Sequence, residues 1–211
     1  MKRTLIALAV IAAAAICSVS CDRQDKGVNN PSIKNIMSRK SVRSFTDKKI
    51  SKEKMEAMLK AAMAAPSGMN VQPWSFVVLT DKSNYDIIFE GNFNLNIFKS
   101  AAAVVVVCAD TTVTRVPRES EDNSPVTMPN RIWRDDMGAC TENLLLAAES
   151  MGLGAVWTAC YPYMDRMEPV RAALGLPLQV VPYSVIAVGY PAGDNQPKDK
   201  WKPERIHYEM W

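Results

Sequence analysis

The feature that most constrains the fold is the run Ala101–Cys108, in which every residue is apolar. Its centre, Val104–Val107, is β-branched throughout, which favours a strand. Side chains of a strand alternate between the two faces of a sheet, so a strand without polar positions has to be covered on both faces. Further strands are predicted over Phe76–Leu79 and Val180–Gly189, where Pro182 favours an edge strand or the beginning of a strand.

Apolar residues at helical spacing predict the elements around these strands. The strongest pattern covers Trp133–Met151, which is apolar on almost every side and predicts a central, buried helix. Gly152 directly after it suits the left-handed residue that commonly follows a helix. The other predicted helices are two turns from Pro31, a helix capped by Ser51 that runs to about Ala64, a broken helix within Tyr85–Phe98, and a weaker helix over Asp165–Leu174.

Residues 1–20 have the composition of a targeting signal. Lys2 and Arg3 precede a short apolar stretch, Leu5–Ile16, and small residues lead to Cys21. This resembles a bacterial lipoprotein signal cleaved before Cys21, although Ser18 stands where leucine is usual; a plain secretory signal and an uncleaved anchor are the alternatives. We therefore expect a signal peptide over residues 1–20, a lipidated Cys21 and polar tether over residues 21–31, one domain over residues 32–211, and a place in the cell envelope, anchored to a membrane by lipid.

Charge and composition exclude several classes of protein. The chain has 25 basic and 22 acidic residues, and removal of the signal would take away Lys2 and Arg3, which leaves 23 against 22. A nearly neutral domain offers no electrostatic reason to bind nucleic acid. With 48% hydrophobic and 22% charged residues, the composition is that of a globular protein, neither disordered nor fibrous.

The cysteines and the histidine also limit the possible chemistry. Cys108, Cys140 and Cys160 are an odd, widely spaced trio, which is neither a disulfide framework nor a zinc pattern. Cys108 and Cys140 lie in apolar patterns and are expected to be small core residues. The single histidine, His207, lies four residues from the end, which argues against a hydrolase with a histidine base and against a histidine-rich metal site.

Ala65–Trp74 is a short loop between a predicted helix and a predicted strand, interrupted by two prolines and a glycine. Its polar side chains are those of Ser67, Asn70 and Gln72. A loop held between two regular elements is a rigid place to present polar groups. An ordinary helix-to-strand turn is the alternative, since most connections are merely short.

Arg39–Phe45 concentrates cationic and hydroxyl side chains after the first predicted helix. Guanidinium groups bind phosphate through two hydrogen bonds, so this segment is a candidate anion site. A solvated basic turn is the alternative. Two later stretches lack a regular pattern: residues 111–131 predict a long surface excursion near a site or a partner, and the aromatic tail Lys200–Trp211 is expected to be docked.

Five segments together resemble the FMN-dependent nitroreductase family. Each segment alone is a weak signal, but here all five occur in the family's order and with compatible spacing, over about residues 32–211. The segments are Arg39–Phe45, Ala65–Trp74, Asp136–Gly154 with Trp157, Val188–Pro191, and Lys200–Pro203.

The resemblance implies an α+β fold, with a mostly antiparallel sheet flanked by helices, in an intertwined homodimer. Two FMN sites would lie at the dimer interface, and each would take residues from both subunits. By similarity, Arg39, Lys40 and Ser41 would hold the phosphate and ribityl chain, Lys200 and Lys202 would close on the phosphate, and Arg43 would approach the pyrimidine edge. The other subunit would supply Pro66, Ser67 and Asn70, with the neighbouring Gln72, which border the ring. The backbone of Gly152, Leu153 and Gly154 would approach the flavin.

The resemblance also implies a reaction. Hydride would pass from NADH or NADPH to the flavin, and then to a nitroaromatic, quinone or similar acceptor, in a two-step mechanism that needs no histidine base. Other flavin chemistry, such as reductive dehalogenation or flavin breakdown, is one alternative, and a non-catalytic, lipid-anchored flavin- or ligand-binding protein is another. Lys40 stands where arginine is common in the family. Asp136 matches a recurrent acidic position of the family, and a favourable interaction with the helix dipole explains an acid there more simply than a catalytic role does.

Overall fold

The computed structural model describes residues 30–89, 94–115 and 128–211. Asn35–Trp211 form one compact unit, and residues 30–34 belong to a separate unit at the N-terminal side. The expected signal peptide, Cys21 and most of the tether lie outside the described residues. None of the helices in the described ranges is both long and apolar enough to cross a membrane.

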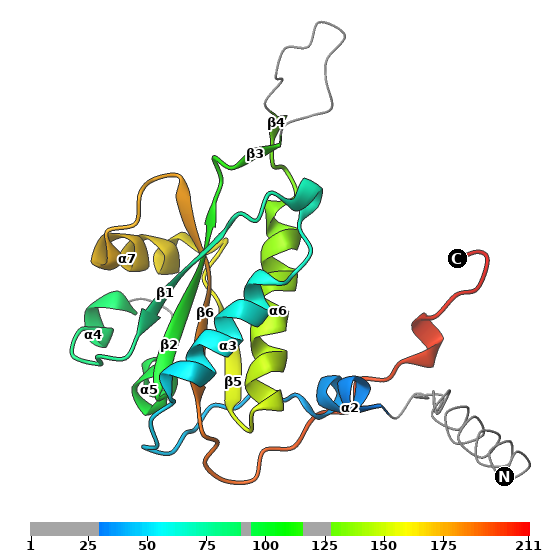
Figure 1. The fold of residues 1–211 in the computed structure, drawn as a ribbon, viewed down its shortest axis with the longest axis horizontal. Helices are drawn as coiled ribbons and strands as arrows, with labels where there is room; N and C mark the ends of the chain where they lie inside the picture. The colour runs from blue at the N-terminus through cyan, green and yellow to red at the C-terminus, as the bar shows by residue number, and fades with distance from the viewer. Residues whose placement is uncertain (1–29, 90–93, 116–127) are drawn as a thin grey trace, which may run out of the picture. The chain divides into compact units, whose positions relative to one another are not determined.

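A four-stranded antiparallel sheet forms the centre of the compact unit (Figure 1). The strand order is β1-β2-β6-β5, and helices flank the sheet, so the predicted α+β fold with an antiparallel sheet is confirmed. The strands are β1 (Trp74–Leu79), β2 (Ala103–Asp110), β5 (Gly154–Ala159) and β6 (Val180–Gly189).

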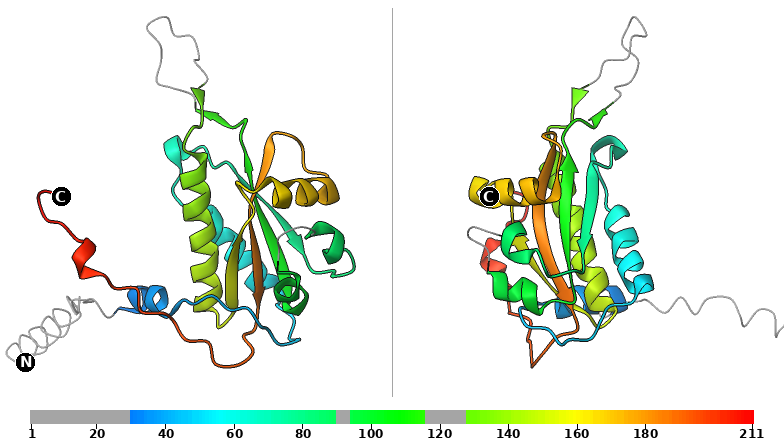
Figure 2. Two further views of the ribbon diagram at one scale, coloured as in Figure 1. Left: turned by 180° about the vertical axis from the view of Figure 1, so that it is seen from behind. Right: turned by 90° about the vertical axis from the view of Figure 1, so that its left-hand side faces the viewer.

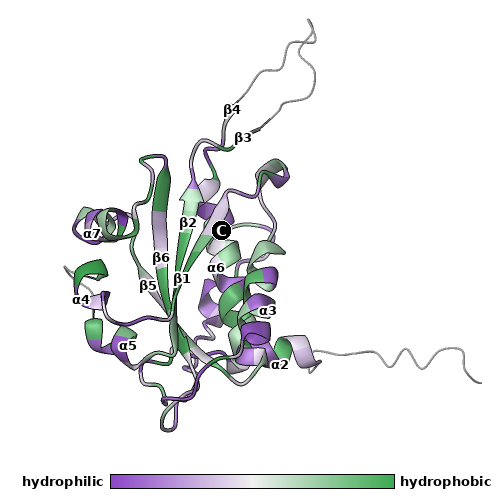
Figure 3. Ribbon diagram, turned by 60° about the vertical axis from the view of Figure 1, so that its left-hand side comes forward, coloured by the Kyte–Doolittle hydropathy of each residue, from purple (hydrophilic) through white to green (hydrophobic). Residues whose placement is uncertain are grey.

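The valine run of β2 supplies the centre of two separate cores. Val104 and Val106 belong to one buried cluster, and Val105 and Val107 belong to the other, as alternation along a strand requires. Every residue of β2 except the last is buried, which confirms that this strand is covered on both faces. Figure 3 shows the hydrophobic colour along β2.

Helices cover both faces of the sheet (Figure 2). On one face, α3 and α6 contribute Met58, Met137 and Leu144 to one core. On the other face, Phe98 and Val170 are among the residues that α4, α5 and α7 contribute to the second core. The bounds are α3 (Lys52–Met63), α4 (Tyr85–Ile88), α5 (Leu95–Ser100), α6 (Trp133–Ser150) and α7 (Met164–Leu174).

Most predicted helix ends are confirmed. Ser51 caps α3, because its Oγ accepts a hydrogen bond from the Lys54 amide at 3.3 Å. Gly152 has a φ of +71° directly after the end of α6, which suits a residue without a side chain. The first helix, α2 (Pro31–Ser38), has the predicted two turns.

Pro182 separates the two alternatives that the sequence left open. It lies near the start of β6, at a register shift in the pairing with β2, where Cys108 is opposite Pro182. The edge-strand alternative is wrong, because β6 lies between β2 and β5. The bulge accommodates a residue that has no amide hydrogen to donate.

Burial explains the three cysteines of the domain. Cys108, Cys140 and Cys160 are almost completely buried, which confirms the prediction for the first two. Burial raises the pKa of each thiol to about 12. Since the thiolate is the reactive form, these cysteines are core residues rather than nucleophiles.

Of the two stretches without a regular sequence pattern, the surface excursion expected over residues 111–131 stays a prediction, because most of it lies outside the described residues. Within residues 111–131, short strands β3 (Thr114–Arg115) and β4 (Met128–Pro129) pair with each other, while residues 116–127 lie outside the described residues. The prediction of a docked C-terminal tail is wrong for the single chain. Trp201, Tyr208 and Trp211 are 69%, 83% and 100% exposed, because the tail runs away from the sheet after β6 (Figure 1).

Candidate functional site

The basic segment Arg39–Phe45 is fastened to the edge strand β5 through Val42. The Val42 side chain is fully buried, and its amide donates a hydrogen bond to the Ala155 carbonyl at 3.0 Å. Val42 can pack this closely against β5 because residue 154 is a glycine: a Cβ there would lie 2.6 Å from Val42 Cγ2. Val42 therefore anchors the segment, and the neighbouring polar side chains are left on its outer side.

A second apolar anchor, Phe45, holds the other end of the segment. Its side chain is only 7% exposed, and it pairs with Pro191 in an antiparallel bridge. A Cβ on Gly189 would lie 2.9 Å from Phe45 Cδ1, so this anchor also sits on a glycine. The Thr46 amide donates to the Tyr190 carbonyl at 2.9 Å and continues the attachment.

Between the basic segment and the start of the C-terminal tail lies a small cavity of about 120 Å³. Extended chain alternates its side chains, so the tail presents every second residue to this cavity. Lys200 lines the cavity, whereas Lys202, the residue before a short 3-10 turn, does not. Contact of these two lysines with a phosphate stays a prediction. The lining residues are Arg39, Lys40, Ser41, Arg43, Gln196, Lys198 and Lys200.

Lys198 also lines the cavity, although it was not among the residues predicted from the sequence. The resemblance implied a role for the pair Lys200 and Lys202, whereas the two lysines of this segment that line the cavity are Lys198 and Lys200. The signal was present in the alternation of Gln196, Lys198 and Lys200 before Pro203. The residue at which the extended segment ends could not be predicted from the sequence.

The cations around the cavity differ in how they are neutralised. Arg39 Nε lies 3.0 Å from Glu142 Oε1, and Lys40 Nζ lies 2.8 Å from Glu149 Oε1. Arg43, Lys198 and Lys200, by contrast, have no ion pair among the described residues. The cavity therefore holds an excess of positive charge, which suits a multiply charged anion.

Gly152, Leu153 and Gly154 form the connection from α6 to β5. Leu153 is buried, and its amide donates to the Ala148 carbonyl at 2.9 Å, which closes the end of the helix. Gly152 has open space where a side chain would be, in contrast to the crowded Gly154. Their approach to a flavin stays a prediction, while their packing role is visible in the fold.

The Ala65–Trp74 loop is held in an unusual backbone conformation. Met69, Asn70 and Gln72 have φ values of 55°, 57° and 51°, in the left-handed region that disfavours residues with a Cβ by roughly 1–2 kcal/mol each. Ser67 Oγ accepts the Gln72 amide at 3.0 Å, and Asn70 Oδ1 accepts Gln72 Nε2 at 2.9 Å. Left-handed residues gathered in one loop are typical of a functional site rather than of an ordinary turn.

The same loop presents its polar groups outward. Pro66, Asn70 and Gln72 are exposed, and Ser67 is half-buried. One contact fixes the loop to the body of the protein: the Gly68 amide donates to Asp136 Oδ1 at 2.9 Å. The residues predicted to border a ring are thus available to a ligand or to a second chain.

The two predicted halves of the site lie at opposite ends of α6. The loop contacts Asp136 in the first turn, and the basic segment contacts Glu149 in the last turn. The separation is about 20 Å along the helix axis, at 1.5 Å per residue. In Figure 1, the loop that follows α3 lies near one end of α6, and the segment that follows α2 passes near the other end. The single chain therefore assembles the anion cavity but does not bring the loop to it.

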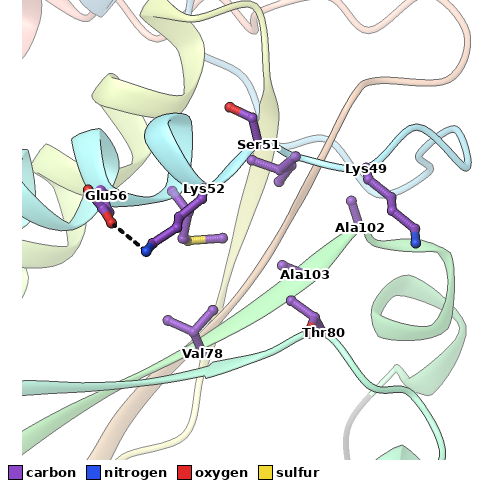
Figure 4. Close-up of a pocket in the computed structure, with 10 residues that line it drawn as sticks. Lys49, Ser51, Lys52, Glu56, Val78, Thr80, Ala102 and Ala103 are labelled. Carbon is purple, nitrogen blue, oxygen red and sulfur yellow. Dashed lines mark ion pairs between the residues drawn. The ribbon is translucent and has the colours of Figure 1, made fainter.

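A larger cavity of about 500 Å³ lies elsewhere, beside the edge strand β1 (Figure 4). The Lys52–Glu56 ion pair, with an N–O distance of 3.7 Å, spans one wall of it. None of the residues predicted for cofactor binding lines this cavity. The small basic cavity is thus the candidate site, although it is the smaller of the two.

Comparison with known proteins agrees with this fold. The sequence profile of the nitroreductase family matches residues 36–89 and 88–190. The chain belongs to the nitroreductase family. An Archaeoglobus fulgidus protein that carries the provisional name NADH dehydrogenase/NAD(P)H nitroreductase is 38% identical over 182 residues, which cover 85% of this chain and 98% of that protein.

Solved nitroreductase structures share the architecture. A Bacteroides thetaiotaomicron structure with the same provisional name is 42% identical, covers 87% of this chain and 99% of its own, and has a TM-score of 0.76. A Desulfovibrio desulfuricans nitroreductase solved in complex with FMN is 26% identical, with coverage of 87% and 99% and a TM-score of 0.68. The family resemblance of the sequence is thereby confirmed.

Proposed function

We propose that this nitroreductase is an FMN-dependent oxidoreductase, which takes hydride from NADH or NADPH and passes it to a nitroaromatic, quinone or similar acceptor in two half-reactions. The observation that carries the proposal is the cavity lined by Arg43, Lys198 and Lys200, which have no counter-ion among the described residues. Support also comes from the relatives named for NAD(P)H oxidation and from the FMN-bound family structure.

The residues of the cavity fit the phosphate end of FMN. A phosphate dianion is best held by several cations and hydrogen-bond donors, and the cavity offers these from two separate segments of the chain. We assign Arg43 to the ring of the bound FMN, where its guanidinium would stabilise negative charge that develops there. When bound, FMN supplies the hydride chemistry, and the protein supplies binding, orientation and space for stacking.

We further propose that the complete site needs a second copy of the chain. The loop carrying Ser67 and Asn70 lies about 20 Å from the basic segment along α6, so a partner's loop has to complete the site. The exposed apolar residues of the tail support the same arrangement. Trp201, Tyr208 and Trp211 are left exposed by the described residues of their own chain, and an intertwined homodimer would cover them.

Titration with FMN tests the proposal directly. The wild-type protein should take up FMN, quench its fluorescence and be reduced by NADH or NADPH. Arg43→Ala should weaken FMN binding by about tenfold, as expected for one lost charged hydrogen-bond donor. Lys60→Ala, at an exposed position on α3, is the matched control and should bind like wild type. A wild-type protein that takes up no FMN would overturn the proposal.

A lipid anchor at Cys21 is a separate proposal, which rests on the signal-like residues 1–20. Cys21→Ser should abolish incorporation of labelled fatty acid and release the protein from the membrane fraction. Fatty-acid labelling of the Cys21→Ser protein would contradict the proposal. Reduced nicotinamides are not expected outside the cytoplasm, so an exported protein would lack an identified electron donor. A non-catalytic flavin-binding role is therefore the alternative. This alternative predicts that the protein binds FMN but that neither NADH nor NADPH reduces the bound flavin.

A further inference from the structure

Asp136 is a buried carboxylate at the start of α6. Its side chain is 5% exposed, and both oxygens are used. Oδ1 accepts the Gly68 amide at 2.9 Å, and Oδ2 accepts Asn130 Nδ2 at 2.8 Å. No cation pairs with it among the described residues. A buried carboxylate is unfavourable unless hydrogen bonds compensate it, so these two donors account for its presence.

Asn130 completes a short network of hydrogen bonds. It is 4% exposed, and its Oδ1 accepts the Ile132 amide at 3.2 Å. Ile132 in turn packs directly against Gly68, where even a Cβ would clash with its side chain. The backbone at Gly68 is therefore fixed by the hydrogen bond that its amide donates to Asp136 and by contact with Ile132.

Gly68 lies next to the left-handed residues of the loop. Met69 and Asn70 follow it directly, and such a backbone persists only where the surroundings hold it. The hydrogen bonds within the loop, such as that from the Gln72 amide to Ser67, link the loop to itself. The bond from Gly68 to Asp136 instead links the loop to the rigid helix α6.

The helix dipole alone does not explain Asp136. Asp135, one residue earlier in the same turn, is exposed and already supplies a negative charge to the start of the helix. Burial and two well-oriented donors distinguish Asp136 from this neighbour.

We propose that Asp136, oriented by Asn130, is a positioning residue that sets the conformation of the Ala65–Trp74 loop and thereby the fit of this loop against the flavin. The proposal rests on the proposed FMN-binding function. Asp136 acts through Gly68 and does not itself touch the cofactor.

An exchange of the two side chains tests the proposal. Asp136→Asn should set an amide against the Asn130 amide, and Asn130→Asp should set two carboxylates together, so each single variant disrupts the network. The double variant Asn130→Asp/Asp136→Asn restores a donor and an acceptor at every contact. Asp135→Asn is the control, because it removes the same charge one residue away.

The readouts separate positioning from stability. We expect each single exchange to weaken FMN binding about tenfold, in line with the loss of a hydrogen bond to a charged group, and to change the visible circular dichroism of the bound flavin. The double variant should recover wild-type affinity within about twofold, and Asp135→Asn should not differ from wild type. Equal FMN affinity and dichroism in all folded variants would overturn the proposal.

Hydrogen exchange of the Gly68 amide distinguishes this proposal from the proposed function. In apo-protein, exchange should be faster in Asp136→Asn and slow again in the double variant. If wild type bound no FMN, the proposed function would fail, while unchanged Gly68 exchange would refute the positioning role itself. Should Asp136→Asn not fold, Asn130→Ala retains the Asp136–Gly68 bond and should show the same changes with smaller amplitude; no change would again refute the role.

Discussion

The basic segment Arg39–Phe45 and the loop Ala65–Trp74 are held in opposite ways. Val42 and Phe45 fasten the first by burying apolar side chains, each on a glycine of the sheet. The loop has no such anchor at its tip, and is held in a left-handed conformation by hydrogen bonds to Ser67 and Asp136. One half of the candidate site thus depends on packing, and the other on polar contacts.

This difference has a functional consequence. Packing resists small changes of pH and ionic strength, and it keeps the cavity's cations in place even while no anion is bound. A polar network holds a specific conformation only while every contact is satisfied. We therefore expect the basic segment to be sensitive to side-chain volume, and the loop to be sensitive to single hydrogen-bonding groups.

The largest effect is expected from Gly154→Ala. Its Cβ would lie 2.6 Å from Val42 Cγ2 in a buried place, so the free energy of unfolding should fall by about 3 kcal/mol. Gly138→Ala is the matched control: its Cβ meets only Tyr183 Oη at 3.7 Å, and alanine favours the helix by roughly 1 kcal/mol. Denaturant unfolding measures the free energy of unfolding of both variants. Equal changes in the two would show that Val42 is not closely packed against Gly154.

A smaller effect is expected from relief of strain in the loop. Met69 is exposed at a φ of 55°, so Met69→Gly should leave the free energy of unfolding unchanged or raise it by up to about 1 kcal/mol. Leu178→Gly, at an exposed loop residue without positive φ, should lower it by about 0.5–1 kcal/mol. If Met69→Gly destabilised the protein as much as Leu178→Gly, the loop would not be strained at this residue.

The smallest effect is expected from the ion pairs between the basic segment and α6. Glu149→Gln should release Lys40 towards the cavity and strengthen FMN binding about threefold, with a steeper dependence on salt. Glu56→Gln removes an exposed ion pair on α3 and is the control. Titrations at two salt concentrations measure this, and weaker binding in Glu149→Gln would mean that Glu149 orients Lys40 rather than neutralising it.

Much of the fold followed from local patterns in the sequence. The valines of Ala101–Cys108 predicted a strand buried on both faces, and Ser51 and Gly152 marked helix ends, because each signal acts within one element. The docked tail was predicted wrongly. Its aromatic residues indicated burial, but local sequence does not say whether the covering surface belongs to the same chain.

The candidate site was predictable only in part, for a similar reason. The cationic residues were visible in Arg39–Arg43, but their neutralisation by Glu142 and Glu149 arises from packing across about a hundred residues of sequence. Asp136 was visible as a helix-start acid, whereas its bond to Gly68 depends on the tertiary fold. Such contacts are fixed by the arrangement of elements and leave no local pattern.

Subunit complementation tests the central claim, that each FMN site combines the basic segment of one chain with the loop of another. Arg43→Ala damages the first half, and Asn70→Trp, at an exposed residue, obstructs the second. Each homodimer alone should bind FMN poorly. After unfolding and refolding together, about half of the dimers should be hybrids with one intact site of two, so FMN binding should return to about a quarter of wild type. A mixture that binds no more FMN than the separate variants would contradict the claim.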